Sequence, residues 1–96
     1  MLDALGDPTR RRVLELVRES GPTPVGAIAA SLPVSRPAVS QHLRVLEGAG
    51  LVTSRRSGTR HLYVVEPDGL AALRLWLDAF WDDALARFAR VAEGSD

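Results

Sequence analysis

A row of polar side chains with helical spacing lies between Arg36 and Arg44. Arg36, Ser40 and Arg44 recur every four residues, and Pro37 and Gln41 flank them. In a helix these five side chains, which we call the polar row, share one face. Arginine pairs with guanine and glutamine with adenine, serine bonds a base edge or a phosphate, and proline touches a thymine methyl group. The row predicts a helix that reads the major groove of DNA, with an ordinary solvated face as the alternative.

A second group of cationic side chains surrounds a predicted turn. Arg55, Arg56 and Arg60 flank Ser57-Gly58-Thr59. Three guanidinium groups in one loop repel each other. That repulsion is relieved when the loop lies along a phosphate backbone or enters a narrow minor groove. The arginines therefore favour contact with a nucleic acid, and an edge strand charged to prevent aggregation is the alternative.

The charges of the 96-residue chain sum to zero but are unevenly placed. Residues 31–65 carry five arginines against one acid, Glu47, for a net charge of +4, and residues 66–96 carry three arginines against seven acids, for −4. A local basic region matters more to a polyanion than the total charge does. Arg36 also lies in a first helical turn, where the helix dipole disfavours a cation by ~0.3–1 kcal/mol unless a polyanion docks there.

The polar row needs a scaffold, and the sequence predicts helices to provide it. Asp7-Pro8 has the residue types that begin a helix, and Ser20-Gly21-Pro22 would end it. A short second helix follows Pro24, and a longer third helix carries the polar row. A short helix, a tight turn and a longer helix over residues 24–49 form a helix-turn-helix.

The third helix has an apolar face and two candidate N-caps. The apolar positions that would fix it to the core are Val39, Leu43 and Leu46. Ser35 and Arg36 both precede Pro37, which a helix tolerates only in its first turn. A residue before proline avoids the helical region, which favours Arg36 as the cap.

The rest of the chain predicts a β-hairpin and one long helix. Residues 51–66 contain two β-rich runs around a glycine turn, and we call this segment the wing. Residues 68–92 then predict a helix, whose run from Leu70 to Ala92 is roughly 35 Å long at 1.5 Å per residue. Residues 1–96 therefore form one domain, mainly α in class: a winged helix-turn-helix with a β-hairpin wing and a long C-terminal dimerisation helix.

The predicted last helix is more apolar than one small core requires. Four of the five aromatic residues of the chain lie in it. A surplus apolar face on a helix is typical of an interface, so we predict a homodimer. The interface residues would be Leu70, Leu73, Leu77, Phe80, Trp81, Ala84 and Phe88. The alternatives are a helix that only caps the monomer core and a hydrophobic ligand pocket beside Trp76 or Trp81.

Two stretches carry a family resemblance. "ALGDPTRRRVLELV", followed by "VSRPAVSQHLRVLEGAGLVTSRRSGTRHLYVV", resembles the ArsR/SmtB family of bacterial winged-helix repressors, over nearly the whole chain. The resemblance implies a dimer that binds an imperfect inverted repeat and is released by an inducer, often a metal. It implies DNA-reading residues at Arg36, Pro37, Ser40 and Gln41, phosphate contact at Arg44, and a DNA-binding wing at Arg55 to Arg60.

The chain departs from the metal-binding patterns of that family. It contains no cysteine for the thiolate site near Ser20–Ile28, and its last helix has carboxylates but no histidine. We therefore expect no metal site and no cofactor, with an oxygen-ligand site at Asp78 and Asp82 as the alternative. An unidentified small-molecule inducer stays open.

Other function classes are disfavoured by what the sequence lacks. Neither His42 nor His61 has partners at catalytic or metal-binding spacing, so we predict that the chain is not an enzyme. His42 is expected to bond the backbone or a phosphate, and His61 to lie on the surface near the wing. No apolar run predicts a membrane span or signal peptide, which indicates a cytoplasmic protein without membrane contact.

The combined prediction is a sequence-specific transcriptional regulator. It would act as a homodimeric repressor on double-stranded operator DNA. The runner-up is a winged-helix module that binds an acidic protein, and a metal-responsive repressor with oxygen ligands is the third reading.

Overall fold

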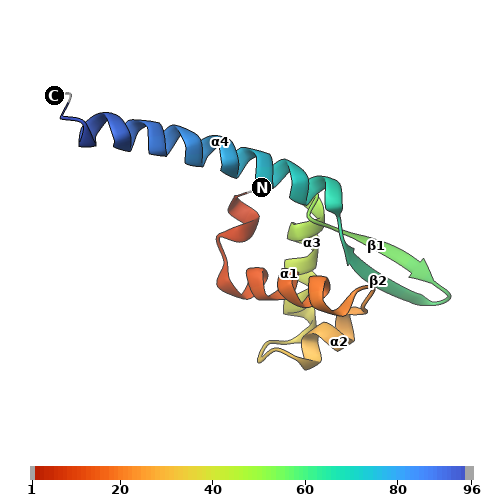
Figure 1. Ribbon diagram of the computed structural model, residues 1–96. Helices are drawn as coiled ribbons and strands as arrows, with labels where there is room; N and C mark the ends of the chain where they lie inside the picture. Colours follow the sequence, from red (N-terminus) through yellow and green to blue (C-terminus); the bar gives the residue numbers. More distant parts are fainter. Residues whose placement is uncertain (1, 95–96) are drawn as a thin grey trace.

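The structure is a computed structural model that describes residues 2–94 (Figure 1). Its elements are the 3₁₀ helix η1 (Asp3–Leu5), α1 (Pro8–Ser20), α2 (Val25–Ala30), α3 (Arg36–Gly48), β1 (Val52–Ser57), β2 (Arg60–Val65) and α4 (Pro67–Ala92). The two strands form one antiparallel sheet. The predicted class, a mainly α winged helix-turn-helix with a long C-terminal helix, is confirmed.

Side-chain caps set where α1 and α3 begin. Asp7 caps α1 and accepts a hydrogen bond from the Arg10 N–H at 3.0 Å, as the Asp7-Pro8 pair predicts. Ser35 caps α3 and accepts from the Ala38 N–H at 3.2 Å. The preference for Arg36 as the cap was wrong. A serine hydroxyl is short enough to reach the free N–H groups of the first turn. Pro37 lies in that turn, where N–H groups have no partner within the helix, so its missing N–H costs no hydrogen bond.

The core lies among the first three helices and the start of the wing. Its fully buried members are Val13, Val17, Ile28, Val39, Leu43, Leu46, Leu51 and Val52. Val39, Leu43 and Leu46 confirm the predicted inward face of α3. At about 1.5–3 kcal/mol for each large apolar side chain, their burial fixes which face of α3 meets solvent.

The wing is a regular hairpin that is tied to the helical body. Its register runs from Val52 opposite Val65 to Ser57 opposite Arg60. Gly58 opens the two-residue turn with φ +64°, a conformation that favours glycine there. The backbones of Thr23 and Tyr63 exchange two hydrogen bonds, of 3.1 and 2.8 Å. This bridge joins β2 to the segment that leads into α2.

Helix α4 leaves the body almost at once. Figure 1 shows it running past α1–α3, with the hairpin extending in the other direction, and the molecule measures 62 × 27 × 20 Å. Leu70 and Leu73 pack against the core, and α4 has no fully buried residue. Gly69 lies so close to the carbonyl of Gly50 that a Cβ at residue 69 would overlap it. The direction of α4 is thus set at its first turn.

Candidate nucleic-acid interface

The polar row occupies the outer face of α3. Arg36, Pro37, Gln41 and Arg44 are exposed, and Ser40 is half-buried. Val39, Leu43 and Leu46 are buried on the other face. The structure therefore places all five side chains on the solvent side of one helix.

Two members of the polar row are bonded to each other. Arg44 donates a hydrogen bond from Nη1 to Oε1 of Gln41 at 3.1 Å. The amide NH₂ of Gln41 is then free to donate, and the remaining N–H groups of Arg44 can still bond a base or a phosphate. Gln41 and Arg44 form a pre-oriented pair.

Arg36 points elsewhere. Its guanidinium lies against Gly26 of α2, where a built Cβ would be 3.6 Å from Arg36 Nη1. It also lines a cleft of about 530 Å³ together with Thr59, Arg60, His61 and Tyr63 of the wing. The cleft shows that the start of α3 and the wing are neighbours. The sequence predicts Arg36 and Arg60 as DNA-binding residues but not Thr59 or Tyr63, because the pattern of a hairpin does not indicate which face of the hairpin turns toward α2.

The wing arginines are solvent-exposed, as are both flanks of the Gly58 turn. Arg56 Nη2 lies 3.4 Å from Nε2 of His61, directly across the strand pair. His61 is exposed, which confirms the predicted surface position. Arg55 and Arg60 are exposed as well, so the hairpin presents cationic groups near its free end.

The arginines of the chain differ in how they are paired. Within residues 2–94 the ion pairs involve Arg12, Arg18, Arg74 and Arg87, on α1 and α4. In that same range none of the five arginines between residues 31 and 65 has a carboxylate partner within 4.0 Å. Glu47, the acid of this region, instead accepts a hydrogen bond from Ser54 at 3.2 Å. The positive charge of α3 and the wing is therefore uncompensated locally.

His42 lies on the inner edge of α3 and belongs to the electrostatic surroundings of the α1 cap. Its Nδ1 is buried and has no hydrogen-bond partner within residues 2–94, so the expected bond to the backbone is not made by this nitrogen. The N–H of Arg10 holds the pKa of Asp7 below its ordinary value, and the N–H of Thr9 and the charge of His42 act in the same direction. Asp7 is therefore kept ionised where it caps α1.

The apolar residues of α4 are largely uncovered. Trp76, Phe80 and Trp81 keep 47%, 59% and 63% of their surface exposed, and Phe88 keeps 71%. The rings of Trp76 and Phe80 stack with centroids 5.4 Å apart and an interplanar angle of 11°. Of the predicted interface residues, Leu70 and Leu73 are partly buried in the core of their own chain. The sequence pattern missed Leu75, which is 71% exposed outside the predicted stripe.

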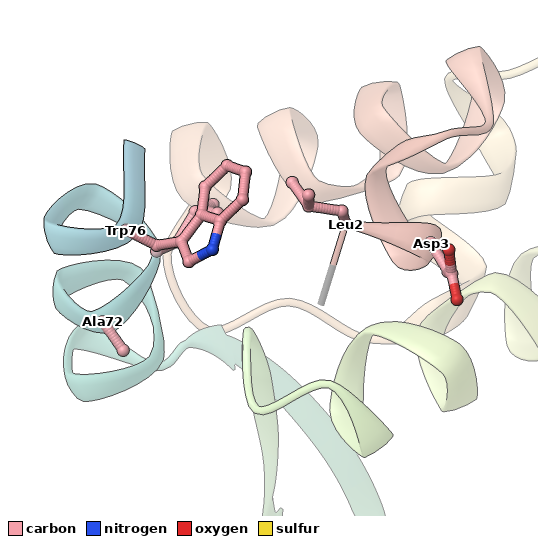
Figure 2. Close-up of a pocket in the computed structure, with 5 residues that line it drawn as sticks. Leu2, Asp3, Ala72 and Trp76 are labelled. Atoms are coloured by element: carbon pink, nitrogen blue, oxygen red, sulfur yellow. The ribbon is translucent and has the colours of Figure 1, made fainter. Parts of the chain in front are cut away.

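The N-terminal segment approaches α4 beside one of these aromatics. Figure 2 shows the indole of Trp76 directed toward Leu2, with Ala72 on the same helix. Leu2, Asp3, Ala72, Leu73 and Trp76 line a hollow of about 460 Å³. The carboxylate of Asp3 is directed away from the indole (Figure 2), so the side chains that face each other across the hollow are mainly apolar.

The acidic residues of α4 have local partners. Asp78 lies 4.0 Å from Arg74, and Asp83 lies 3.3 Å from Arg87, both as i,i+4 pairs. Across residues 2–94 no three His, Cys, Asp or Glu side chains are grouped closely enough to hold a metal ion. No helix in the same range has the length and apolar character needed to cross a membrane.

Known proteins share both the sequence and this arrangement. A family model described as a helix-turn-helix domain matches residues 5–55. The HTH-type transcriptional regulator Rv2034 of Mycobacterium tuberculosis is 54% identical over 95 residues, which cover 97% of this chain and 88% of that protein. Transcriptional repressor SdpR of Bacillus subtilis is 38% identical over 53 residues, which cover 55% of this chain and 58% of that protein.

Solved structures agree with the sequence relatives. The crystal structure of a "Possible transcriptional regulator for arsenical resistance" is 49% identical with a TM-score of 0.78, and the match covers 92% of this chain and 91% of that one. A homodimeric winged helix-turn-helix DNA-binding domain from Mycobacterium bovis, named as a possible ArsR-family regulator, is 30% identical with a TM-score of 0.65. That match covers 88% of this chain and 78% of the other. The chain belongs to the ArsR/SmtB family of winged helix-turn-helix transcriptional regulators.

Proposed function

We propose that this regulator is a homodimeric repressor that binds an inverted-repeat operator through α3 and the wing. The observation that carries the proposal is the uncompensated charge of these two elements, which meet at one cleft. Unpaired arginines on adjoining elements repel each other in the free protein, and a phosphate backbone relieves that repulsion.

Helix α3 and the wing would contribute differently to DNA binding. The outer face of α3 would lie in the major groove, where Ser40 and the Gln41–Arg44 pair meet base edges. Arg55 and Arg56 would contact the sugar-phosphate backbone or a narrow minor groove. Base contacts would supply sequence preference, and wing contacts would supply affinity for any duplex.

The exposed face of α4 would pair two copies of the chain. A 26-residue helix with exposed Trp, Phe and Leu side chains and no buried residue is a poor structure for an isolated monomer. The interface would be centred on Leu77, Phe80, Trp81, Ala84 and Phe88, with Leu70 and Leu73 at its inner end. Pairing would set two α3 helices one DNA turn apart, roughly 34–36 Å, to match an inverted repeat.

A gel-shift titration tests the proposal. The probe is the DNA upstream of the gene for this chain, the competitor is random duplex of equal length, and the salt concentration is set at two values. We expect a discrete shift that survives competitor, weakens as salt rises and titrates with a stoichiometry of two chains per site. Absence of any shift at low salt would instead favour the protein-binding module.

Release of the operator would be tested separately. Divalent metal ions followed by a chelator would reveal a metal-responsive repressor with oxygen ligands. Fluorescence of Trp76 and Trp81 during titration with candidate small molecules would reveal an organic inducer, since the Trp76 indole borders the hollow beside Leu2.

A further inference from the structure

The cleft between α2, α3 and β2 has the chemistry of an anion site. Two guanidinium-bearing residues, Arg36 and Arg60, line it together with His61, and its described lining contains no carboxylate. Its volume of about 530 Å³ is larger than one phosphate group needs, and both arginines are solvent-exposed. An anion carried by a long polymer can therefore reach the guanidinium groups without displacing protein atoms.

The Arg36 side chain lies beside Gly26. A Cβ built on Gly26 would stand 3.6 Å from Nη1 and 3.7 Å from Cζ of Arg36, so the guanidinium rests against the backbone of α2. A side chain longer than alanine at residue 26 would push it away. Arg36 is also one of the residues that line the cleft.

The opposite wall of the cleft is fixed by the bridge between Thr23 and Tyr63. Their two backbone hydrogen bonds, of 3.1 and 2.8 Å, join the segment before α2 to β2, and Thr23 is buried. Arg60 begins that same strand. The bridge thus holds β2 beside the segment before α2, and Arg60 lies just beyond it, in the tip of the wing.

We propose that this cleft holds one phosphate of the DNA backbone in each half-site, clamped between Arg36 and Arg60. The inference rests on the proposed DNA-binding function and reassigns Arg36 from reading a base to positioning the duplex. A phosphodiester offers two unesterified oxygens and one negative charge, which a planar guanidinium can bond through two parallel N–H groups. A phosphate held at this point fixes the register in which Gln41 meets its base pair.

Neutral linkages in the DNA test the clamp. Operator duplexes are made with one methylphosphonate at each successive position, which removes a single phosphate charge, and binding is measured for the full-length protein. With the wild type, neutralising one linkage per half-site should weaken binding roughly tenfold. With Arg36→Ala or Arg60→Ala that position should lose its effect, while the ratio of operator to random affinity stays unchanged.

Gln41→Ala is the matched control on the same helix. It should keep the sensitivity to the neutral linkage and lose the operator-to-random ratio, the reverse of Arg36→Ala. Arg36→Lys should recover part of the affinity, since it restores the charge without the planar fork. Both arginines are exposed, so their variants should unfold at the same temperature as the wild type. If they do not, Arg36→Gln and Arg60→Gln replace the alanine variants.

Three results separate the possible failures. If Arg36→Ala lowers the operator-to-random ratio and leaves every linkage as sensitive as before, Arg36 reads a base and the clamp is wrong. The clamp also requires that millimolar inorganic phosphate at constant ionic strength compete with DNA more strongly in the wild type than in Arg36→Ala, and equal competition in both would overturn the assignment. If the wild type binds no duplex at all, the proposed function fails before the clamp is examined.

Discussion

Arg44 and Gln41 are joined by a 3.1 Å hydrogen bond on the outer face of α3. A glutamine that reads adenine must present its amide oxygen and nitrogen in the correct order. Because the Arg44 donor can bond only the oxygen, it selects one of the two amide orientations. The side chain most suited to base recognition is therefore positioned by its neighbour one helical turn away.

We predict that Gln41→Ala reduces discrimination at one base pair by ~1–3 kcal/mol. Arg44→Ala should weaken the same discrimination, and the double variant should lose less than the sum because the two residues act together. Competition binding to operators with single base changes measures both effects. Arg18→Ala, which removes an arginine already paired with Glu19, is the control. Equal losses on operator and random duplexes would contradict base reading by this pair.

Removal of an arginine side chain from the wing should lower affinity for all duplexes and leave sequence preference unchanged. Arg56→Ala removes a charge without a carboxylate partner, so operator and random duplexes should weaken alike. The slope of log K against log salt should fall by about 0.9 for one lost phosphate contact. Titrations at several salt concentrations provide the measurement. An unchanged slope would show that the Arg56 guanidinium stays in solvent in the complex.

Replacement of Phe80 and Trp81 by alanine should shift the protein from dimer to monomer. Truncation of a central aromatic side chain in an interface costs about 2 kcal/mol or more, and neither residue contributes to the monomer core. Sedimentation equilibrium reports the mass, and circular dichroism reports the helices. Leu75→Ala removes an equally exposed apolar side chain outside the predicted stripe. Dissociation by Leu75→Ala alone would place the interface on another face of α4.

Gly69→Ala should destabilise the fold because its methyl group would overlap the Gly50 carbonyl. We expect a loss on the order of 1–3 kcal/mol, the usual cost of overpacking, measured by urea unfolding. The matched control is Gly48→Ala, which meets no atom within 4 Å and should be neutral or slightly stabilising. A Gly69→Ala protein as stable as wild type would mean that α4 can leave the body at another angle.

The cap of α1 should give stability a pH dependence. The folded pKa of Asp7 is depressed, so its carboxylate stabilises the native state above the unfolded pKa, and this contribution disappears as pH falls through the folded value. Asp7→Asn keeps a capping oxygen but has no charge to titrate. The wild type should exceed it in melting temperature at neutral pH, and the difference should close below roughly pH 4. A gap that is constant with pH would assign the effect to the hydrogen bond alone.

Local signals in the sequence account for most of the fold. The start at Asp7-Pro8, the inward face of α3 and the hairpin around Gly58 each depend on residues a few positions apart, so their patterns predict them. At Ser35 two local rules disagreed, and the capping hydrogen bond outweighed the restriction before Pro37. The order of the elements and the long last helix were predicted from local patterns of the same kind.

The relations that build the site were beyond such patterns. The contact of Arg36 with Gly26, and that of Gly69 with Gly50, join residues whose proximity exists only after packing. The polar row could therefore be assigned to one helix face, but the direction of the Arg36 side chain could not. The interface stripe on α4 stays a prediction, since it concerns contacts between two chains.

The bridge between Thr23 and Tyr63 makes the wing a continuation of the helical body for half its length. Only the part from Arg55 to Leu62 extends past that anchor. Binding to DNA then needs to immobilise a short tip and not a whole hairpin, so little conformational entropy is lost. A wing held in this way is pre-organised for binding. Substitution of Thr23 would therefore alter the dissociation rate of the complex, although residue 23 itself would not contact the nucleic acid.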